Sequence, residues 1–329
     1  MKIAVLGAGA YGTSLALHLA HAHDVVLWTR NQAHLASMLA TRANPLYLGD
    51  YTFPDALALQ GDFAAVLEGA DLVLSVVPTA GLRQVLREIR SLRCTAPVVM
   101  ACKGLESATA QLVPEVVVDE LPLGQPWGIL SGPSFASEVA KGLPTALTLA
   151  SGDEEFARAA GVAIHGRNVR VYTSQDTVGV AVGGALKNVM AIAAGISDGM
   201  GFGNNARAAL ITRGLAEITR FGLALGGRQE TFMGLTGAGD LILTCTGDAS
   251  RNRTVGLRLA RGETLQQIVS SLGHVAEGVH TTREVHHRAR ELGVDMPITH
   301  VVNRVLSEGL SPREAVETLL SREQKAEAC

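Results

Sequence analysis

Lys187 lies inside a glycine-rich apolar stretch, residues 179–188, that holds no other charged side chain. Glycine disfavours a helix by up to about 1 kcal/mol relative to alanine, so these glycines indicate a helix that something approaches closely. Gly183 and Gly184 lie one helical turn before Lys187 on nearly the same face, which predicts free space for a ligand beside the ammonium. Burial would lower the pKa of this lysine and suit it to proton transfer near neutral pH. The alternative is a lysine whose ammonium reaches solvent at the domain edge.

A carboxylate follows a second glycine-rich segment. Asp240 comes directly after residues 234–239 and precedes an apolar stretch. In isolation it could simply be a helix N-cap. Placed beside Lys187, it would instead hold the ammonium or a substrate hydroxyl in position, and Thr244, one helical turn later, would share its face. The lysine and the aspartate together predict a general acid/base and the group that orients it.

Two short segments offer further polar groups. Ser250, Arg251 and Asn252 open a helical segment and bring a hydroxyl, a guanidinium and an amide to its N-terminus, which predicts a compact anion site. The alternative there is an ordinary charged helix start. Glu277 lies in a predicted loop, residues 274–278, and its spacing leaves two interpretations open. It could accept hydrogen bonds from the amide group of a ligand, or it could cap a helix.

These groups need a scaffold, and the N-terminal residues predict one. Residues 3–6 suit a strand buried on both faces, and the turn that follows carries three spaced glycines. Gly7 permits the tight turn, Gly9 lets the backbone approach a pyrophosphate, and Gly12 lets the next helix pack against the strand. The N–H groups at the start of that helix then form an anion site without a charged side chain. The pattern predicts a dinucleotide-binding turn.

Two residues that follow predicted strands extend this site. Arg30 comes after a strand at residues 25–28, where an NAD-specific site usually places Asp or Glu. Because arginine accommodates a 2′-phosphate, the sequence favours NADP. Lys103 comes after a strand within residues 97–102, at the sheet edge where ligands bind in open α/β folds. For both residues the alternative is a solvated surface side chain. Residues 127–136 repeat the pattern of strand, small-residue turn and helix.

The order of the predicted elements indicates an α/β fold with two domains. Strands alternate with helices to about residue 173, which predicts a Rossmann-type dinucleotide-binding domain at residues 1–174. From residue 175 onward the apolar residues recur with a helical period, which predicts an all-helical substrate-binding domain at residues 175–329. Further strands are expected at residues 71–78, 145–150 and 169–172, and helices at residues 11–20, 154–164, 206–225, 254–260, 265–271, 281–292 and 312–320, with another beginning near residue 176.

The composition limits the function. The 329 residues, 47% hydrophobic and 18% charged, fit a globular protein with two domains. A net charge of -3 without a long basic run argues against nucleic-acid binding. The four cysteines have no metal-like spacing, which predicts no metal site and a reducing cytosol, and no signal peptide is expected before the first strand. Residues 178–196 are apolar enough for a membrane span, but a central lysine costs about 2.5–3.5 kcal/mol there, so we expect a buried helix.

Seven motifs occur in order along nearly the whole chain. They are Gly-Ala-Gly-Ala-Tyr-Gly at 7–12, Cys-Lys-Gly-Leu-Glu at 102–106, Ser-Gly-Pro-Ser-Phe-Ala at 131–136, Gly-Gly-Ala-Leu-Lys-Asn at 183–188, Gly-Met-Gly-Phe-Gly-Asn-Asn-Ala-Arg-Ala at 199–208, Asp-Leu-Ile-Leu-Thr-Cys-Thr at 240–246 and Ser-Arg-Asn-Arg at 250–253. Together they closely resemble the bacterial NAD(P)-dependent glycerol-3-phosphate dehydrogenases. Several ordered motifs are far more specific than the glycine turn alone.

The resemblance implies reversible hydride transfer between NAD(P)H and dihydroxyacetone phosphate, giving sn-glycerol 3-phosphate for phospholipid synthesis. Lys187 would donate the proton in reduction, with Lys103 and Asp240 in the catalytic set, and Arg251 with Asn252 would hold the phosphate. With the residues discussed above, the expected substrate contacts are Lys103, Gly132, Ser134, Lys187, Asp240, Thr244, Ser250, Arg251 and Asn252. The expected cofactor contacts are Gly7, Gly9, Ala10, Tyr11, Gly12, Arg30, Lys103, Ala136, Arg251, Val275 and Glu277. A serine is usual at the position of Ala10, so only a backbone contact is expected there. A cytoplasmic homodimer is also expected, with NADPH favoured over NADH.

Two other functions are compatible with many of these residues. A reductase of the 3-hydroxyacid or ketopantoate type would share the glycine turn, the helical second domain and a lysine in a helix. It would give no reason for a phosphate-binding cluster at residues 250–253. A regulator that senses NAD(P) without turnover would need neither Lys187 nor Asp240, so replacing either should leave its signalling intact.

Overall fold

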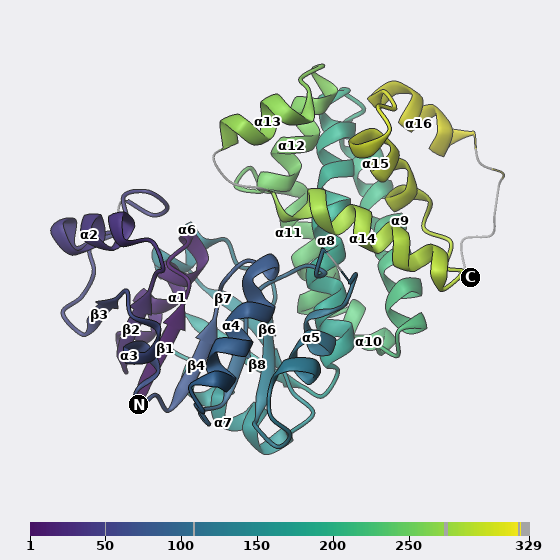
Figure 1. Cartoon of the computed structure of the whole chain (residues 1–329). Helices are drawn as coiled ribbons and strands as arrows, with labels where there is room; N and C mark the ends of the chain where they lie inside the picture. The colour runs from purple at the N-terminus through teal and green to yellow at the C-terminus, as the bar shows by residue number, and fades with distance from the viewer. Residues whose placement is uncertain (50, 108, 273–275, 322, 324–329) are drawn as a thin grey trace.

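The computed structural model describes residues 1–49, 51–107, 109–272, 276–321 and 323. Within these residues, eight strands form one sheet in the order β3-β2-β1-β4-β5-β6-β7-β8, and a helical region packs at one end of the sheet domain (Figure 1). The strands are β1 (Lys2–Leu6), β2 (Asp24–Trp28), β3 (Leu57–Gln60), β4 (Leu72–Ser75), β5 (Val98–Met100), β6 (Trp127–Ser131), β7 (Thr145–Ala150) and β8 (Val169–Ser174). Each neighbouring pair is parallel except β6 and β7, which are antiparallel.

The sheet is buried on both faces, as its apolar strands predict. In β1, Ile3 and Val5 belong to one core cluster, whereas Ala4 and Leu6 belong to another, because successive side chains of a strand point to opposite faces. The helices of this part are α1 (Ala10–Leu19), α2 (Gln32–Thr41), α3 (Phe63–Leu67), α4 (Thr79–Ser91), α5 (Val113–Glu120), α6 (Ala136–Ala140) and α7 (Glu154–Ile164). The predicted Rossmann-type domain is confirmed.

The rest of the described chain is helical, as predicted. It comprises α8 (Thr177–Gly199), α9 (Gly203–Ala224), α10 (Gln229–Phe232), a single π-helical turn η1 (Leu235–Gly239), α11 (Asp240–Thr246), α12 (Arg251–Ala260), α13 (Leu265–Leu272), α14 (Glu277–Glu291), α15 (Pro297–Ser307) and α16 (Pro312–Leu320). Helix α8 is long and apolar enough to cross a membrane, but its most apolar window is 100% buried inside the protein. It is a core helix, which confirms the prediction.

Helix α8 packs in two cores. Val180 and Ala181, in its first turns, lie in the same cluster as Met100 of β5 and Ile129 of β6. From Val182 onward, its residues contribute to the core of the helical region. The helix that carries Lys187 is therefore fixed against the sheet and against the other helices at once.

Several elements differ from the sequence-based expectations. No helix or strand is predicted at residues 32–41, 57–60, 79–91, 113–120 or 297–307, where α2, β3, α4, α5 and α15 lie. Helices α9, α12 and α14 begin three or four residues earlier than their apolar period predicts, because polar first turns carry no such period. The loop predicted at residues 274–278 is therefore wrong at its end, since Glu277 and Gly278 form the first turn of α14.

Candidate active site

The turn between β1 and α1 has the geometry that its three glycines predict. Gly7 has a φ of 115°, which favours glycine. A Cβ at Gly12 would overlap the carbonyl oxygen of Gly7, so α1 can start against β1 only with glycine there. At Gly9, by contrast, an added Cβ would meet no atom within 4 Å, and no side chain caps α1. The open surface and the uncapped N–H groups fit a dinucleotide pyrophosphate.

A buried polar network that the sequence analysis missed supports this turn. The Nδ2 atom of Asn44 donates to the carbonyl oxygen of Ala8 at 2.9 Å and to the hydroxyl of Thr13 at 2.7 Å. The Oδ1 atom of Asn44 lies 2.9 Å from the Nε2 atom of His34. Asn44 is fully buried. Its position 36 residues from Ala8 follows no periodic pattern, so the sequence held no signal for this contact.

Three of the other predicted cofactor residues lie around the same sheet edge. Arg30 is exposed just after β2, which pairs in parallel with β1, so the two strands end together. The hydroxyl of Tyr11 lies 3.0 Å from that of Ser134, which joins the β1–α1 turn to the turn after β6. Ala136 is the first residue of α6. Val275 lies outside the described residues.

Three charged side chains meet where the two domains face each other. Asp240, the first residue of α11, is fully buried. One of its oxygens accepts a hydrogen bond from Lys187 of α8, and the other accepts one from Lys103, just past β5, at 2.7 Å. The two lysine side chains are only 10% and 13% exposed. One buried carboxylate thus holds two ammonium groups from different domains.

The two lysines have different electrostatic surroundings. Burial lowers the pKa of Lys187 to about 8; the nearby Lys103 acts in the same direction, whereas Asp240 opposes the shift. Burial also disfavours the charged form of Lys103, but the attraction of Asp240 and Tyr11, together with the hydrogen bonds to Asp240 and Lys187, outweighs it, so the pKa of Lys103 is raised. The site therefore holds one permanent cation, Lys103, beside a lysine that can exchange its proton near neutral pH.

The space that Gly183 and Gly184 were expected to leave for a ligand is filled by the protein, and this part of the prediction is wrong. A Cβ at Gly183 would overlap the backbone carbonyl of Thr236 in η1, and a Cβ at Gly184 would lie 2.8 Å from the hydroxyl of Ser131. The glycines do permit a close approach, but protein backbone and side chains make it rather than a ligand. This approach places the end of η1, and with it Asp240, against α8.

The turn after β6 also binds Lys103. The carbonyl oxygen of Gly132 accepts hydrogen bonds from the Nζ atom of Lys103 and from the hydroxyl of Ser134, both at 3.0 Å. Gly132 has a φ of 130°, and a Cβ there would lie 3.0 Å from the carbonyl oxygen of Ala146. The Nζ atom of Lys103 also lies 6.0 Å from the centre of the Tyr11 ring. Lys103 is thus fixed by groups from both predicted binding regions.

Thr244 lies on the same face of α11 as Asp240. Its hydroxyl donates to the backbone carbonyl of Asp240 at 2.6 Å and is 3.4 Å from the Oδ1 atom of that residue. A second set of side chains begins α12. Ser250 caps this helix by accepting the N–H of Arg253 at 3.2 Å, and Arg251, the first helical residue, is exposed.

The third residue of this set, Asn252, is buried between helices. Its Nδ2 atom donates to the Oδ1 atom of Asn188 at 2.9 Å, and its own Oδ1 accepts the N–H of Gly278 at 3.1 Å. Asn188 adjoins Lys187 and received no role in the sequence analysis, although its place in the same motif was a usable signal. Burial raises the pKa of Glu277, against the attraction of Arg251 and of the two lysines, so these groups share one electrostatic environment.

The two halves of the chain match two models of one family. Residues 2–157 match the family described as the N-terminus of NAD-dependent glycerol-3-phosphate dehydrogenase, and residues 176–317 match the one described as its C-terminus. The chain is 68% identical over 328 residues to the glycerol-3-phosphate dehydrogenase (NAD(P)+) of Methylobacillus flagellatus, with 100% of both chains covered.

Solved structures agree with these matches. The glycerol-3-phosphate dehydrogenase of Coxiella burnetii is 44% identical with a TM-score of 0.94, over 98% of this chain and 99% of that one. A ketopantoate reductase from Ralstonia eutropha JMP134 shares the fold alone, with 18% identity and a TM-score of 0.59 over 96% of this chain and 100% of that one. Together with the glycine turn and the paired lysines, these findings show that the chain belongs to the NAD(P)+-dependent glycerol-3-phosphate dehydrogenases and is an oxidoreductase.

Proposed function

We propose that the protein reversibly reduces dihydroxyacetone phosphate to sn-glycerol 3-phosphate, with Lys187 as the general acid and NADPH as the favoured reductant. The observation that carries this proposal is the buried Asp240 carboxylate, which holds Lys187 and Lys103 together while the pKa of Lys187 is lowered to about 8. A general acid works best when its pKa is close to the working pH.

The reaction adds a hydride to the C2 carbonyl carbon and a proton to the carbonyl oxygen. Bound NAD(P)H supplies the hydride. The Lys187 ammonium gives one proton to the developing alkoxide and is then neutral until solvent protonates it again. Asp240 orients Lys187, and the fixed positive charge of Lys103 stabilises the oxygen while it is negative. In the oxidation direction the neutral Lys187 accepts the proton from the alcohol.

The remaining polar groups of the site suit a small phosphorylated substrate. The hydroxyl of Ser250, the exposed guanidinium of Arg251 and the amide of Asn252 lie at the start of α12, where backbone N–H groups also favour an anion. We assign the phosphate to these three residues. Gly132, Ser134 and Thr244 are assigned to the rest of the substrate, since each bonds to, or lies beside, Lys103 or Asp240.

For the cofactor, the pyrophosphate is assigned to the backbone of the β1–α1 turn, with Gly7, Gly9, Ala10, Tyr11 and Gly12. Arg30 is assigned to the 2′-phosphate, which is the reason for favouring NADPH. Lys103, Ala136, Arg251, Glu277 and Val275, the last outside the described residues, complete the proposed set. We further propose a boundary between the domains at residues 174 and 175, a cytoplasmic homodimer, and a role in supplying phospholipid synthesis.

The proposal is tested by following NADPH absorbance with purified protein and three ketones. We expect rapid oxidation with dihydroxyacetone phosphate and little with unphosphorylated dihydroxyacetone or ketopantoate. Replacing NADPH by NADH should lower kcat/KM, and Arg30→Gln should reduce this preference. Equal turnover of the phosphorylated and unphosphorylated ketones would contradict the phosphate site at residues 250–252.

A further inference from the structure

The segment that follows β5 brings Lys103 to Asp240 and then returns to α5. After Lys103, Gly104 passes between two helices, since a Cβ there would lie 3.1 Å from the hydroxyls of both Thr79 in α4 and Thr281 in α14. Leu105 then pairs with Leu112 across an isolated antiparallel bridge, and both side chains are buried in the core of the helical region. The position of Lys103 therefore depends on how this segment is held.

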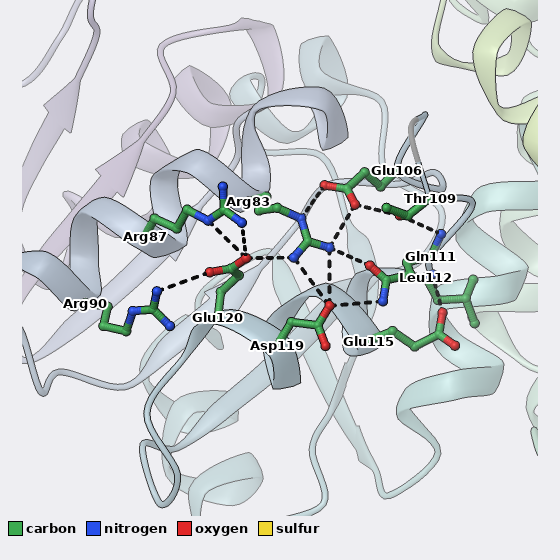
Figure 2. Close-up of polar contacts among 10 residues, drawn as sticks. All are labelled: Arg83, Arg87, Arg90, Glu106, Thr109, Gln111, Leu112, Glu115, Asp119 and Glu120. Atoms are coloured by element: carbon green, nitrogen blue, oxygen red, sulfur yellow. Dashed lines mark hydrogen bonds and ion pairs between the residues drawn. The ribbon is translucent and has the colours of Figure 1, made fainter.

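Arg83 of α4 binds the outer part of the segment. The Nε and Nη2 atoms of Arg83 in α4 bind the two oxygens of Glu106, each at 2.8 Å, in a two-pronged ion pair (Figure 2). The Nη2 atom also binds the side-chain oxygen of Gln111, and the Nη1 atom binds Glu120 of α5 at 2.7 Å. The side chains of Arg83 and Glu106 are 19% and 13% exposed, so solvent screens this pair only partly.

The backbone closes the same segment into a compact turn. The N–H of Glu106 donates to the carbonyl oxygen of Gln111, and the N–H of Ala110 donates to that of Glu106, both at 2.9 Å. Arg288 of α14 also binds this turn, because it donates to the carbonyl oxygen of Ala110 at 2.9 Å. Lys103 is only three residues from Glu106, so a shift of this turn is transmitted directly to the lysine.

We propose that Arg83 is a positioning residue for Lys103, acting through its two-pronged ion pair with Glu106. This inference rests on the proposed role of Lys103 at the reacting oxygen. Asp240 binds Lys103 at one end of residues 103–106, and Arg83 binds Glu106 at the other end. Misplacement of a charged group by about 1 Å can cost on the order of 100-fold in rate.

The matched control is Arg87, one helical turn further along α4. Arg87 also binds Glu120, with its Nε atom at 3.1 Å, and its side chain is 59% exposed. Arg83 also joins α4 to α5, through Glu120 at 2.7 Å and Asp119 at 3.3 Å, and if it only did this its effect would persist when Lys103 is replaced. If Arg83 acts through Glu106, only its loss affects turnover.

The first experiment compares Arg83→Met and Arg87→Met with the unchanged protein, using NADPH and dihydroxyacetone phosphate. We expect kcat/KM to fall by about 10- to 100-fold in Arg83→Met and by less than about twofold in Arg87→Met. The dissociation constant for NADPH, measured by fluorescence, should change by less than about threefold in both variants, because the β1–α1 turn is untouched, and this binding also reports that each variant is folded. Arg83→Lys keeps the positive charge but cannot form the two-pronged ion pair with Glu106, so an intermediate loss of kcat/KM is expected. Equal effects of Arg83→Met and Arg87→Met would overturn the inference.

The second experiment asks whether the effect passes through Lys103. In a Lys103→Gln background, Arg83→Met should lower kcat/KM by less than about twofold, because the group it positions is gone. A loss as large as in the unchanged background would show a purely structural role. If the unchanged protein does not turn over the phosphorylated ketone, the proposed function fails instead, so the two failures are distinct.

The pH dependence gives an independent readout. Lys187 is faced by Asp240 and Cys245 from α11, by Lys103 from the segment after β5 and by Glu277 from α14, and Lys103 lowers its pKa. When Lys103 moves away in Arg83→Met, the alkaline limb of kcat should therefore shift to higher pH. A profile identical to that of the unchanged protein would contradict the inference.

Discussion

Two glycine-rich segments of this chain use the same residue in opposite ways. In the β1–α1 turn, Gly9 faces open space, where an added Cβ would meet nothing within 4 Å. In α8, Gly183 and Gly195 are pressed against the backbone of Thr236 and Arg253, where a Cβ would overlap a carbonyl oxygen. The first segment leaves room for a ligand, and the second lets other parts of the protein approach. A glycine-rich pattern thus indicates a close approach without telling what approaches.

The comparison also separates binding from chemistry. The turn offers backbone N–H groups and little ionisable character, whereas α8 offers Lys187 and the contact that brings Asp240 beside it. Changes in the turn should alter cofactor affinity, and changes in α8 should alter turnover or stability. Substitutions in the two segments distinguish these two roles.

The largest effect is expected at the lysine of α8. Lys187→Met should lower kcat with dihydroxyacetone phosphate by roughly 10³-fold, because it removes the proposed proton donor. The dissociation constant for NADPH, measured by fluorescence titration, should change by less than about threefold, since the turn is untouched. A variant with near-normal turnover would refute the role of Lys187, and a large loss of NADPH affinity would break the division between the two segments.

Next in size is the close contact between α8 and η1. Gly183→Ala should reduce the free energy of unfolding by about 3 kcal/mol, because backbone atoms must move to admit the methyl group. Urea unfolding measures this loss. The matched control is Gly184→Ala, whose added Cβ would meet the Ser131 hydroxyl, a side chain that can rotate, so a smaller loss is expected. Equal losses would show that the contact with Thr236 is not special.

A substitution in the β1–α1 turn should weaken NADPH binding and leave the stability of the protein unchanged. Gly9 has a φ of -74°, which alanine adopts readily, so Gly9→Ala should leave the free energy of unfolding within about 0.5 kcal/mol of its original value. The methyl group would enter the space assigned to the pyrophosphate, and the dissociation constant for NADPH should rise about tenfold, or about 1.4 kcal/mol. Gly152→Ala, at another open position, serves as control and should change neither quantity. Unchanged affinity in Gly9→Ala would place the cofactor elsewhere.

The smallest and most graded effect is that of pH. Burial lowers the pKa of Lys187 to about 8, and this lysine is the proposed acid in reduction, so kcat should fall as pH rises through about 8, and in oxidation it should rise over the same range. Because this pKa lies below the ordinary value of 10.5, the unfolded chain binds more protons between those values, and stability should increase with pH there. Initial rates in both directions between pH 6 and 10 test the first part. A flat reduction profile would contradict it.

Most features that depend on residues close together in the sequence could be predicted from it. The glycine turn, the change from strands to helices after residue 174 and the adjacency of polar groups in motifs all follow from neighbours along the chain. The partners of Gly183 and Gly184, the support of the turn by Asn44, and the binding of Glu106 by Arg83 join residues between 23 and 53 positions apart. Such contacts depend on how finished elements pack, and no spacing in the sequence encodes them.

Helix α8 has a consequence for how the protein unfolds. Its first turns complete the core beneath β5 and β6, and the rest of it forms the centre of the helical region. If the chain were cut at residue 174, the sheet would lose Val180 and Ala181 and expose an apolar face to water. We therefore expect the two domains, although distinct in architecture, to unfold together, and heating should melt them in a single calorimetric peak.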